Sequence, residues 1–165
     1  MARSRAVVVA CAAVLLGSAA VGWWLAGHAS RPTVATVIDT LDGDTIVVRT
    51  DDARTLTIRL LGVDTPETHH PTKPVECFGP EAAAYTRARL FGQRVTLAYD
   101  VERHDIYGRV LAYVSIDGKR FNDELLTLGY ARLLVIPPNG DHARTMLRSM
   151  LAARNAGRGL WGVCN

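Results

Sequence analysis

The chain has 165 residues, 48% of them hydrophobic, with 19 basic and 16 acidic side chains and a formal net charge of +3. This length allows one domain with a real core, and this apolar content excludes a largely disordered chain. Without residues 1–30, the chain has 17 basic and 16 acidic side chains. Bulk charge alone therefore does not indicate a nucleic-acid-binding protein.

Residues 6–27 form an uncharged apolar stretch that follows two arginines and ends near a pair of tryptophans. The stretch is long enough to span a bilayer, whereas the apolar region of a secretory signal usually has about 7–15 residues. Small residues before Ser30 are also compatible with cleavage. We expect residues 1–30 to be a membrane anchor or a signal peptide. In both cases the domain at residues 31–165 is extracytoplasmic, either membrane-anchored or secreted.

Two cysteines remain in the predicted domain, Cys77 and Cys164. An oxidising compartment favours disulfides, so we expect these two to pair, with two buried thiols as the alternative. The bond would join the C-terminal tail to the middle of the domain. On a chain-entropy argument it would stabilise the fold by up to roughly 4–5 kcal/mol.

The first strands are predicted from β-branched runs and turn residues. Residues 34–41 and 44–50 flank the pair Asp42-Gly43, which is typical of a hairpin turn. After a second turn, residues 54–62 alternate apolar and polar side chains, as expected of a half-buried strand. Three consecutive antiparallel strands are the result.

Residues 64–80 contain four prolines and little apolar periodicity, which predicts a loop. Loops of this length in compact domains often have a function. Pro80 at a first helical position and Gly92 past the end indicate a helix over about residues 80–91.

Two more strands are predicted at residues 95–100 and 110–116. Asn122 is expected to cap a short helix that ends at Gly129, and Asp141 a longer one. Five strands and three helices predict an α+β domain, mainly a small β-barrel of the OB type with helices packed outside it. An N-terminal hydrophobic helix precedes this domain.

Charged side chains gather at three places on the predicted barrel: Asp42 and Asp44 at the first turn, residues 59–67 at the end of the third strand, and residues 107–109 before the fifth. Each group alone has an ordinary explanation as turn or surface residues. Together they supply hard oxygen ligands for a divalent cation, a carboxylate to handle an attacking water, and guanidinium groups for charge on a phosphorane. The combination predicts phosphodiester cleavage.

These segments resemble the staphylococcal nuclease (thermonuclease) family, and the similarity runs from about Thr33 to Trp161. The family has an OB-type barrel with three helices. The resemblance implies a calcium-dependent nuclease that hydrolyses DNA and RNA, prefers single strands and leaves 3′-phosphate ends. We expect a monomer with nucleic acids as partners, no obligate protein partner, and membrane contact through residues 6–27 if they are retained.

The resemblance also implies a calcium site. Asp44 and Asp64 match the calcium-binding carboxylates of the family, and Thr65 matches a residue whose main-chain carbonyl coordinates calcium. Asp42 matches an acidic residue just outside the calcium ligands, in contact with substrate, with a plain turn residue as the alternative.

The catalytic and substrate-binding residues follow from the same resemblance. Glu67 matches the proposed general base, and Arg59 and Arg109 match two arginines that bind the scissile phosphate. Their planar, permanently charged groups suit bidentate contact with phosphate better than lysine does. Tyr107 matches a tyrosine that contacts the terminal phosphate of the nucleotide.

Three positions depart from the family pattern. Ile106 replaces a lysine, and Val135 and Pro137 stand where two tyrosines border the base. We expect weaker base stacking and an altered substrate preference, with the chemistry retained. The alternative function is a non-catalytic OB-fold module that binds nucleic acid. That alternative predicts a partly lost ligand set, whereas both carboxylates, both arginines and the glutamate are present here in the right order.

Overall fold

The computed structural model describes residues 32–68 and 74–164. The predicted anchor or signal peptide at residues 1–30 lies outside these residues, as does most of the proline-rich loop tip. No helix within the two described ranges is long and apolar enough to cross a membrane. Residues Pro32–Asn165 cluster as one unit.

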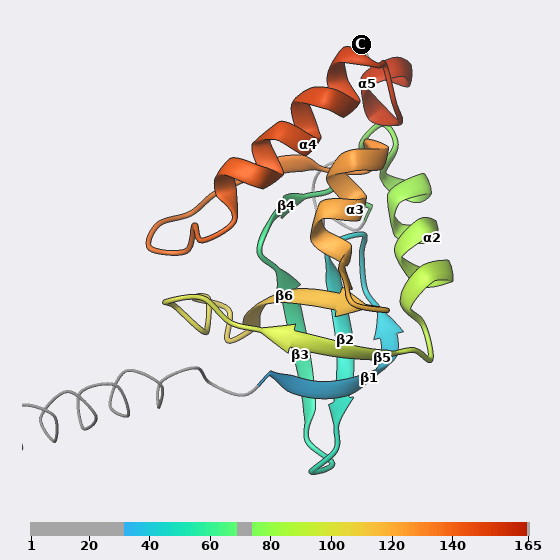
Figure 1. The fold of residues 1–165 in the computed structure, drawn as a ribbon. Helices are drawn as coiled ribbons and strands as arrows, with labels where there is room; N and C mark the ends of the chain where they lie inside the picture. The colour runs from blue at the N-terminus through green and yellow to red at the C-terminus, as the bar shows by residue number, and fades with distance from the viewer. Residues whose placement is uncertain (1–31, 69–73, 165) are drawn as a thin grey trace, which may run out of the picture. The chain divides into compact units, whose positions relative to one another are not determined.

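Five strands form a closed barrel (Figure 1). Their order around the barrel is β3-β2-β1-β5-β6, and parallel pairing of β3 with β6 closes it. This confirms the predicted OB-like barrel. The strands are β1 (Thr33–Thr40), β2 (Thr45–Thr50), β3 (Thr55–Leu60), β5 (Arg94–Ala98) and β6 (Val110–Ile116).

Alternation along the strands fills the barrel interior. In β2, Ile46 and Val48 are fully buried while Arg49 points to solvent, because successive side chains of a strand face opposite sides. Val37, Ile58 and Leu97 of the neighbouring strands complete the same core. Burial of such side chains contributes about 1.5–3 kcal/mol each.

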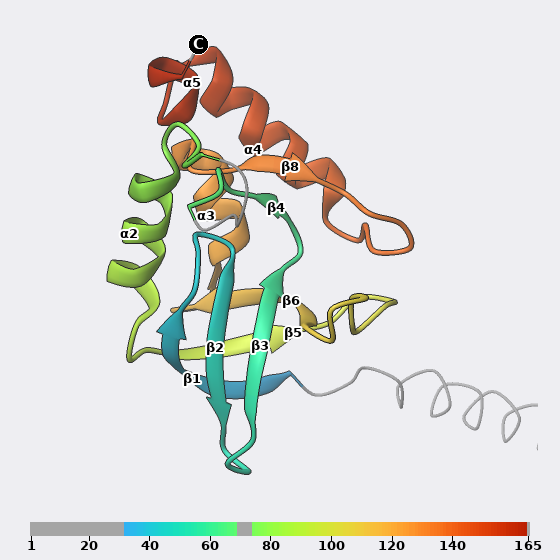
Figure 2. The ribbon, with the colours of Figure 1, turned by 180° about the vertical axis from the view of Figure 1, so that it is seen from behind.

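Three helices pack outside the barrel, as predicted: α2 (Gly79–Leu90), α3 (Phe121–Leu128) and α4 (Ala143–Asn155). A short α5 (Leu160–Val163) follows them. Seen from behind, α2 and α4 lie on different sides of the upper part of the unit (Figure 2).

The two predicted helix caps are wrong. Arg120 occupies the N-cap of α3 and His142 that of α4, and neither makes a side-chain capping bond. Asn122 is fully buried inside the first turn of α3. Its Oδ1 accepts the Val114 N–H at 2.9 Å and its Nδ2 donates to the Leu61 carbonyl at 2.8 Å. Asn122 therefore joins α3, β6 and the end of β3.

Three very short strands add to the predicted set: β4 (Gly62–Asp64), β7 (Lys119–Arg120) and β8 (Arg132–Leu134). β4 pairs with β8 in an antiparallel ladder that sets Asp64 opposite Arg132. β4 takes up the end of the predicted third strand, and the predicted loop at residues 64–80 begins where β4 ends. The β4–β8 ladder fixes the position of Asp64 at the rim of the barrel.

A disulfide joins Cys77 to Cys164, with 5.9 Å between the two Cα atoms. Cys77 lies just before α2, and Cys164 is the C-cap of α5. The C-terminal end of the domain is therefore attached covalently to the segment that leads into α2.

Candidate active site

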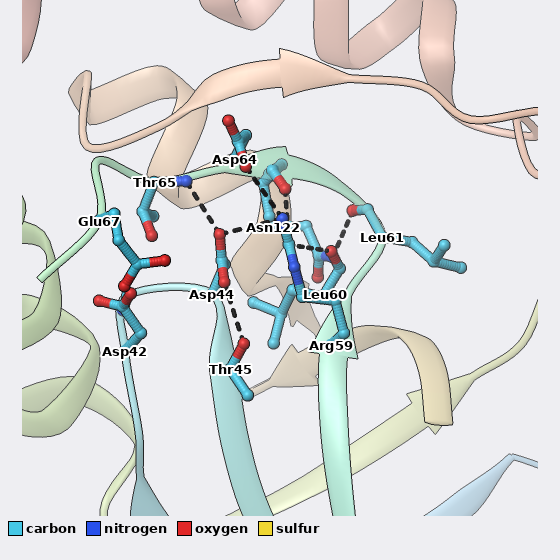
Figure 3. Close-up of polar contacts among 12 residues, drawn as sticks. Asp42, Asp44, Thr45, Arg59, Leu60, Leu61, Asp64, Thr65, Glu67 and Asn122 are labelled. Carbon is cyan, nitrogen blue, oxygen red and sulfur yellow. Dashed lines mark hydrogen bonds and ion pairs between the residues drawn. The ribbon is translucent and has the colours of Figure 1, made fainter. Parts of the chain in front are cut away.

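A polar cavity of about 300 Å³ opens where the β1–β2 turn, the end of β3 and residues 64–67 meet. Figure 3 shows most of its side chains converging from these three segments. We call it the acidic cavity. Five carboxylates, two arginines and two threonines line it: Asp42, Asp44, Thr45, Arg59, Asp64, Thr65, Glu67, Glu76 and Arg109. It brings together every predicted site residue except Tyr107.

Asp44 is held at the base of this cavity. Its side chain is buried, and its two oxygens accept hydrogen bonds from the Thr65 N–H at 3.0 Å and the Thr45 hydroxyl at 3.1 Å. Gly43 permits this close approach, because a Cβ there would lie 2.8 Å from the Thr65 side chain. The hairpin turn and the segment after β4 are thereby locked together.

Arg59 bridges the two aspartates. Its Nη2 lies 3.2 Å from Asp44 Oδ2 and 3.0 Å from Asp64 Oδ1. Its Nη1 donates to the carbonyls of Leu60 and Val63 at 3.0 and 2.7 Å. With its side chain only 14% exposed, Arg59 is fixed in orientation. Burial raises the pKa of Asp64, and the charge of Arg59 opposes that effect.

The donor atoms around Asp44 and Asp64 suit a hard cation. Carboxylate oxygens, carbonyl oxygens and waters are the ligands that Ca²⁺ takes in proteins. The Thr65 hydroxyl is buried and has no hydrogen-bond partner within the described residues. No group of three or more His, Cys, Asp or Glu in residues 32–68 and 74–164 is arranged to hold a metal ion. A cation at this place would therefore rely on two carboxylates and on uncharged oxygens.

Asp42 and Glu67 form a carboxyl pair on the other side of the cavity. Asp42 accepts hydrogen bonds from the Gly43 N–H at 2.8 Å and the Thr68 hydroxyl at 2.9 Å. Burial and a hydrogen bond shared with Glu67 raise the pKa of Asp42 to about 6. A raised pKa of this kind means that the pair holds a proton more readily than two separate carboxylates do.

Glu76 holds the segment that carries Glu67. Its N–H donates to the Glu67 carbonyl at 2.9 Å, and its carboxylate accepts from the Glu67 N–H at 3.4 Å. Glu76 directly precedes Cys77, so the disulfide lies next to this contact. The sequence prediction missed Glu76, because it lies beyond the proline-rich loop with no motif of its own.

Arg109 is oriented by Asp105. The Arg109 Nε donates to Asp105 Oδ2 at 2.6 Å, while the main-chain N–H groups of Tyr107 and Arg109 donate to Oδ1 at 3.0 and 2.9 Å. Burial alone would raise the pKa of Asp105, but these contacts with Arg109 hold it below its usual value. Sequence reasoning also missed Asp105. An aspartate four residues before an arginine, with a glycine between them, is typical of a turn in which the aspartate accepts main-chain N–H groups, and this pattern could have indicated the contact.

A second cavity of about 390 Å³ borders the first and shares Arg59 and Arg109 with it. We call it the apolar cavity. Tyr107, 77% exposed, and Ile106, 91% exposed, line it from the β5–β6 loop. The other lining residues are Leu60, Leu61, Gly62, Val63, Glu102, Asp105, Leu111, Leu134, Ile136 and Asn139. Tyr107 thus shares the apolar cavity with Arg59 and Arg109, whereas the other predicted catalytic and calcium-binding residues line only the acidic cavity.

Residues 134–137 include two of the positions that depart from the family pattern. Leu134 and Ile136 line the apolar cavity, whereas Val135 and Pro137 are not among its lining residues. The sequence had placed Val135 and Pro137 at the border of a bound base. A shift of one residue reverses which side chains face a site along an extended segment.

Most of the site residues lie in a part of the sequence that matches a known protein family. The family model described as "Staphylococcal nuclease homologue" matches residues 57–163, a span that holds Arg59, Asp64, Glu67 and Arg109. The chain belongs to the staphylococcal nuclease family. The resemblance inferred from the motifs is thereby confirmed.

Individual relatives agree with the family. The chain is 38% identical to a thermonuclease of Staphylococcus hyicus, over 76% of this chain and 73% of the relative. It is 41% identical to a thermonuclease of Staphylococcus intermedius, over 73% and 71% of the two chains. It is also 35% identical to the SPbeta prophage-derived endonuclease YokF of Bacillus subtilis, over 73% of this chain and 41% of that protein. These members of the staphylococcal nuclease family support a nuclease activity for this chain.

Proposed function

We propose that this protein is a calcium-dependent nuclease that hydrolyses the phosphodiester bonds of DNA and RNA, prefers single strands and leaves 3′-phosphate ends. The main support is the bridge of Arg59 between Asp44 and Asp64, in one cavity with Arg109 and Glu67. Carboxylates for a cation and guanidinium groups for a phosphate are both needed at such a centre.

Asp44, Asp64 and Thr65 are the residues that would hold calcium. Their oxygens are hard donors, and the Thr65 hydroxyl lacks a partner within the described residues. When bound, calcium supplies Lewis-acid polarisation of a phosphoryl oxygen. The ion pairs of Arg59 with both aspartates limit their mutual repulsion before the cation binds.

Glu67 acts on the attacking water in this proposal, either by accepting its proton or by orienting it. Its carboxylate accepts the Thr68 N–H at 3.1 Å, and Asp42 lies beside it as a neighbouring proton carrier. Arg59 and Arg109 bind the scissile phosphate and stabilise the charge that develops on it. Tyr107 contacts a phosphate further along the substrate.

We also propose that the domain works outside the cytoplasm, either secreted or held by the segment at residues 6–27. The Cys77–Cys164 disulfide supports this location, because stable disulfides form mainly in oxidising compartments.

Cleavage of heat-denatured DNA by the full chain tests the proposal directly. Cleavage is expected with calcium and is expected to stop with a chelator, and the products should carry 3′-phosphate ends. Glu67→Gln should lower turnover by roughly 10²–10⁴-fold, while Glu81→Gln, an exposed glutamate in the first turn of α2, serves as the matched control. Cleavage that continues in chelator would contradict the calcium mechanism. Binding of DNA without cleavage would favour the non-catalytic OB-fold module.

A further inference from the structure

Charge is divided unevenly along the domain. Residues 32–141 carry 12 basic and 16 acidic side chains, a net charge of −4, whereas residues 142–164 carry four arginines and no acidic residue, a net charge of +4. The net charge of the whole domain is near zero, so it does not show this uneven distribution. A local excess of one sign creates a field that attracts an oppositely charged polymer.

The arginines of the two parts differ in their partners. Seven arginines pair with Asp or Glu within the described residues: Arg54, Arg59, Arg87, Arg89, Arg94, Arg109 and Arg120. None of Arg144, Arg148, Arg154 and Arg158 forms an ion pair in that part of the chain. All four are exposed. Their charges are therefore available to a ligand.

Arg132 and Trp161 connect these arginines to the acidic cavity. Arg132 lies opposite Asp64 in the β4–β8 ladder. Its Cζ lies 5.9 Å from the centroid of the Trp161 ring, and the Cζ of Arg154 lies 5.6 Å from the same ring. α4 runs alongside β8 in both views of the fold (Figures 1 and 2). Positive charge thus continues from the rim of the cavity to Arg154 in the last turn of α4.

We propose that this basic surface, made of Arg132, Arg144, Arg148, Arg154, Arg158 and Trp161, binds the phosphodiester backbone of a nucleic-acid substrate beyond the bond that is cut. Guanidinium groups bind phosphates with paired hydrogen bonds, and an indole ring offers a stacking face to an unpaired base. The surface would act mainly on long substrates, because no residue of α4 lines either cavity. This inference rests on the proposed nuclease function.

An anionic membrane is the competing partner. Leu147 and Leu151 are 40% and 41% exposed on α4, and a basic helix with exposed apolar residues is also typical of membrane surfaces. We favour nucleic acid, because Arg132 lies beside Asp64 and makes the surface continuous with the predicted cleavage centre.

The test compares two double variants of the full chain, Arg148→Gln/Arg154→Gln and the control Arg54→Gln/Arg94→Gln. Both remove two exposed positive charges. Arg54 and Arg94 pair with Asp52 and Asp51 of the β2–β3 turn, at the opposite end of the unit from α4 (Figure 1). kcat/KM is measured at several salt concentrations on long denatured DNA and on a 5′-phosphorylated dinucleotide.

The α4 variant should lower kcat/KM on long DNA roughly tenfold at low salt, and its slope against log salt should fall by roughly 0.7 for each lost phosphate contact. The control variant should match the unmodified chain, and dinucleotide cleavage should not change in either. Unchanged long-DNA kinetics would overturn the proposal, as would an equal loss on both substrates.

A binding measurement separates this inference from the proposed function. Fluorescence anisotropy of a long labelled single strand in chelator reports the basic surface without any cleavage. If the unmodified chain cuts neither substrate, the proposed function fails, and a weaker anisotropy signal for the α4 variant alone would still support the basic surface. Loss of binding to phosphatidylserine vesicles, with DNA binding unchanged, would overturn it in favour of a membrane contact.

Discussion

The acidic and apolar cavities share two arginines but are built in opposite ways. In the acidic cavity Asp44 accepts two hydrogen bonds, and Arg59 donates to two carbonyls and pairs with two aspartates. The apolar cavity is bounded mainly by aliphatic side chains such as Leu111, Leu134 and Ile136. Directional bonds fix the first in one geometry, whereas shape and surface area define the second.

This difference separates chemistry from selectivity. Changes in the acidic cavity should alter the rate of bond cleavage on any substrate, because they disturb groups that act on the reacting phosphate. Changes in the apolar cavity should alter affinity for particular nucleotides with little effect on turnover. Arg109 lies on the boundary and should affect both.

Among changes that compare the two cavities, Arg109→Ala should have the largest effect. The variant should lower kcat by roughly 10²–10³-fold, because one fixed donor to the developing charge is lost. Steady-state kinetics on denatured DNA measure the effect, with Arg103→Ala as the control, since Arg103 is an exposed arginine that stacks on Tyr99. Equal activity of the two variants would remove Arg109 from the catalytic groups.

Loss of stability by about 2–4 kcal/mol is expected for Asn122→Ala, because the Val114 N–H and the Leu61 carbonyl would be left buried without partners. Leu61 lines the apolar cavity. Urea unfolding measures the change, and Asn155→Ala at the exposed end of α4 is the control. A loss of activity without a loss of stability would mean that Asn122 does not stabilise the packing of α3 against the barrel.

Asp105→Asn should lower kcat/KM roughly tenfold, because Arg109 keeps its charge but loses its fixed orientation. It should also change the pH dependence of stability. The folded-state pKa of Asp105 is depressed, so its stabilising contribution is present at neutral pH and is lost as pH falls through that pKa.

Thermal unfolding of Asp105→Asn and of the control Asp51→Asn, scanned from neutral to acid pH, tests this sign. The difference in melting temperature from the unmodified chain should be largest at neutral pH and should vanish in acid. A difference that grows in acid would contradict the assigned contact.

The smallest effect is expected in the apolar cavity. Leu134→Tyr should lower KM for denatured DNA roughly three- to tenfold with kcat unchanged, because base–aromatic stacking is worth about 1–3 kcal/mol. Leu128→Tyr on α3 is the matched control, since Leu128 and Leu134 are 39% and 38% exposed. A change in kcat alone would erase the distinction between the two cavities.

Local patterns explain why the acidic cavity could be predicted. Asp42 and Asp44 lie in the β1–β2 turn, and Arg59 lies on β3, which pairs with β2. Short turns between antiparallel strands already place these three residues near one rim. The predicted bounds of β6, residues 110–116, agree with the structure. The family resemblance then assigned Asp64 to the calcium site, Glu67 to the attacking water and Arg109 to the scissile phosphate.

The missed features depend on contacts between distant segments. β4 and β8 have three residues each, and residues some 70 positions apart form their ladder, so neither shows a periodic pattern. Asn122 carries the sequence signal of a cap, but its amide reaches across to Leu61 instead.

The Cys77–Cys164 disulfide affects what happens when a protease cuts the chain. A single cut by a protease between residues 78 and 163 would leave two fragments that remain one covalent molecule. Such a nicked protein would keep its mass on a non-reducing gel and separate only after reduction. Because α2, the barrel strands β5 and β6 and α4 all lie within that interval, a cut in any of them would leave the two fragments attached and able to refold together.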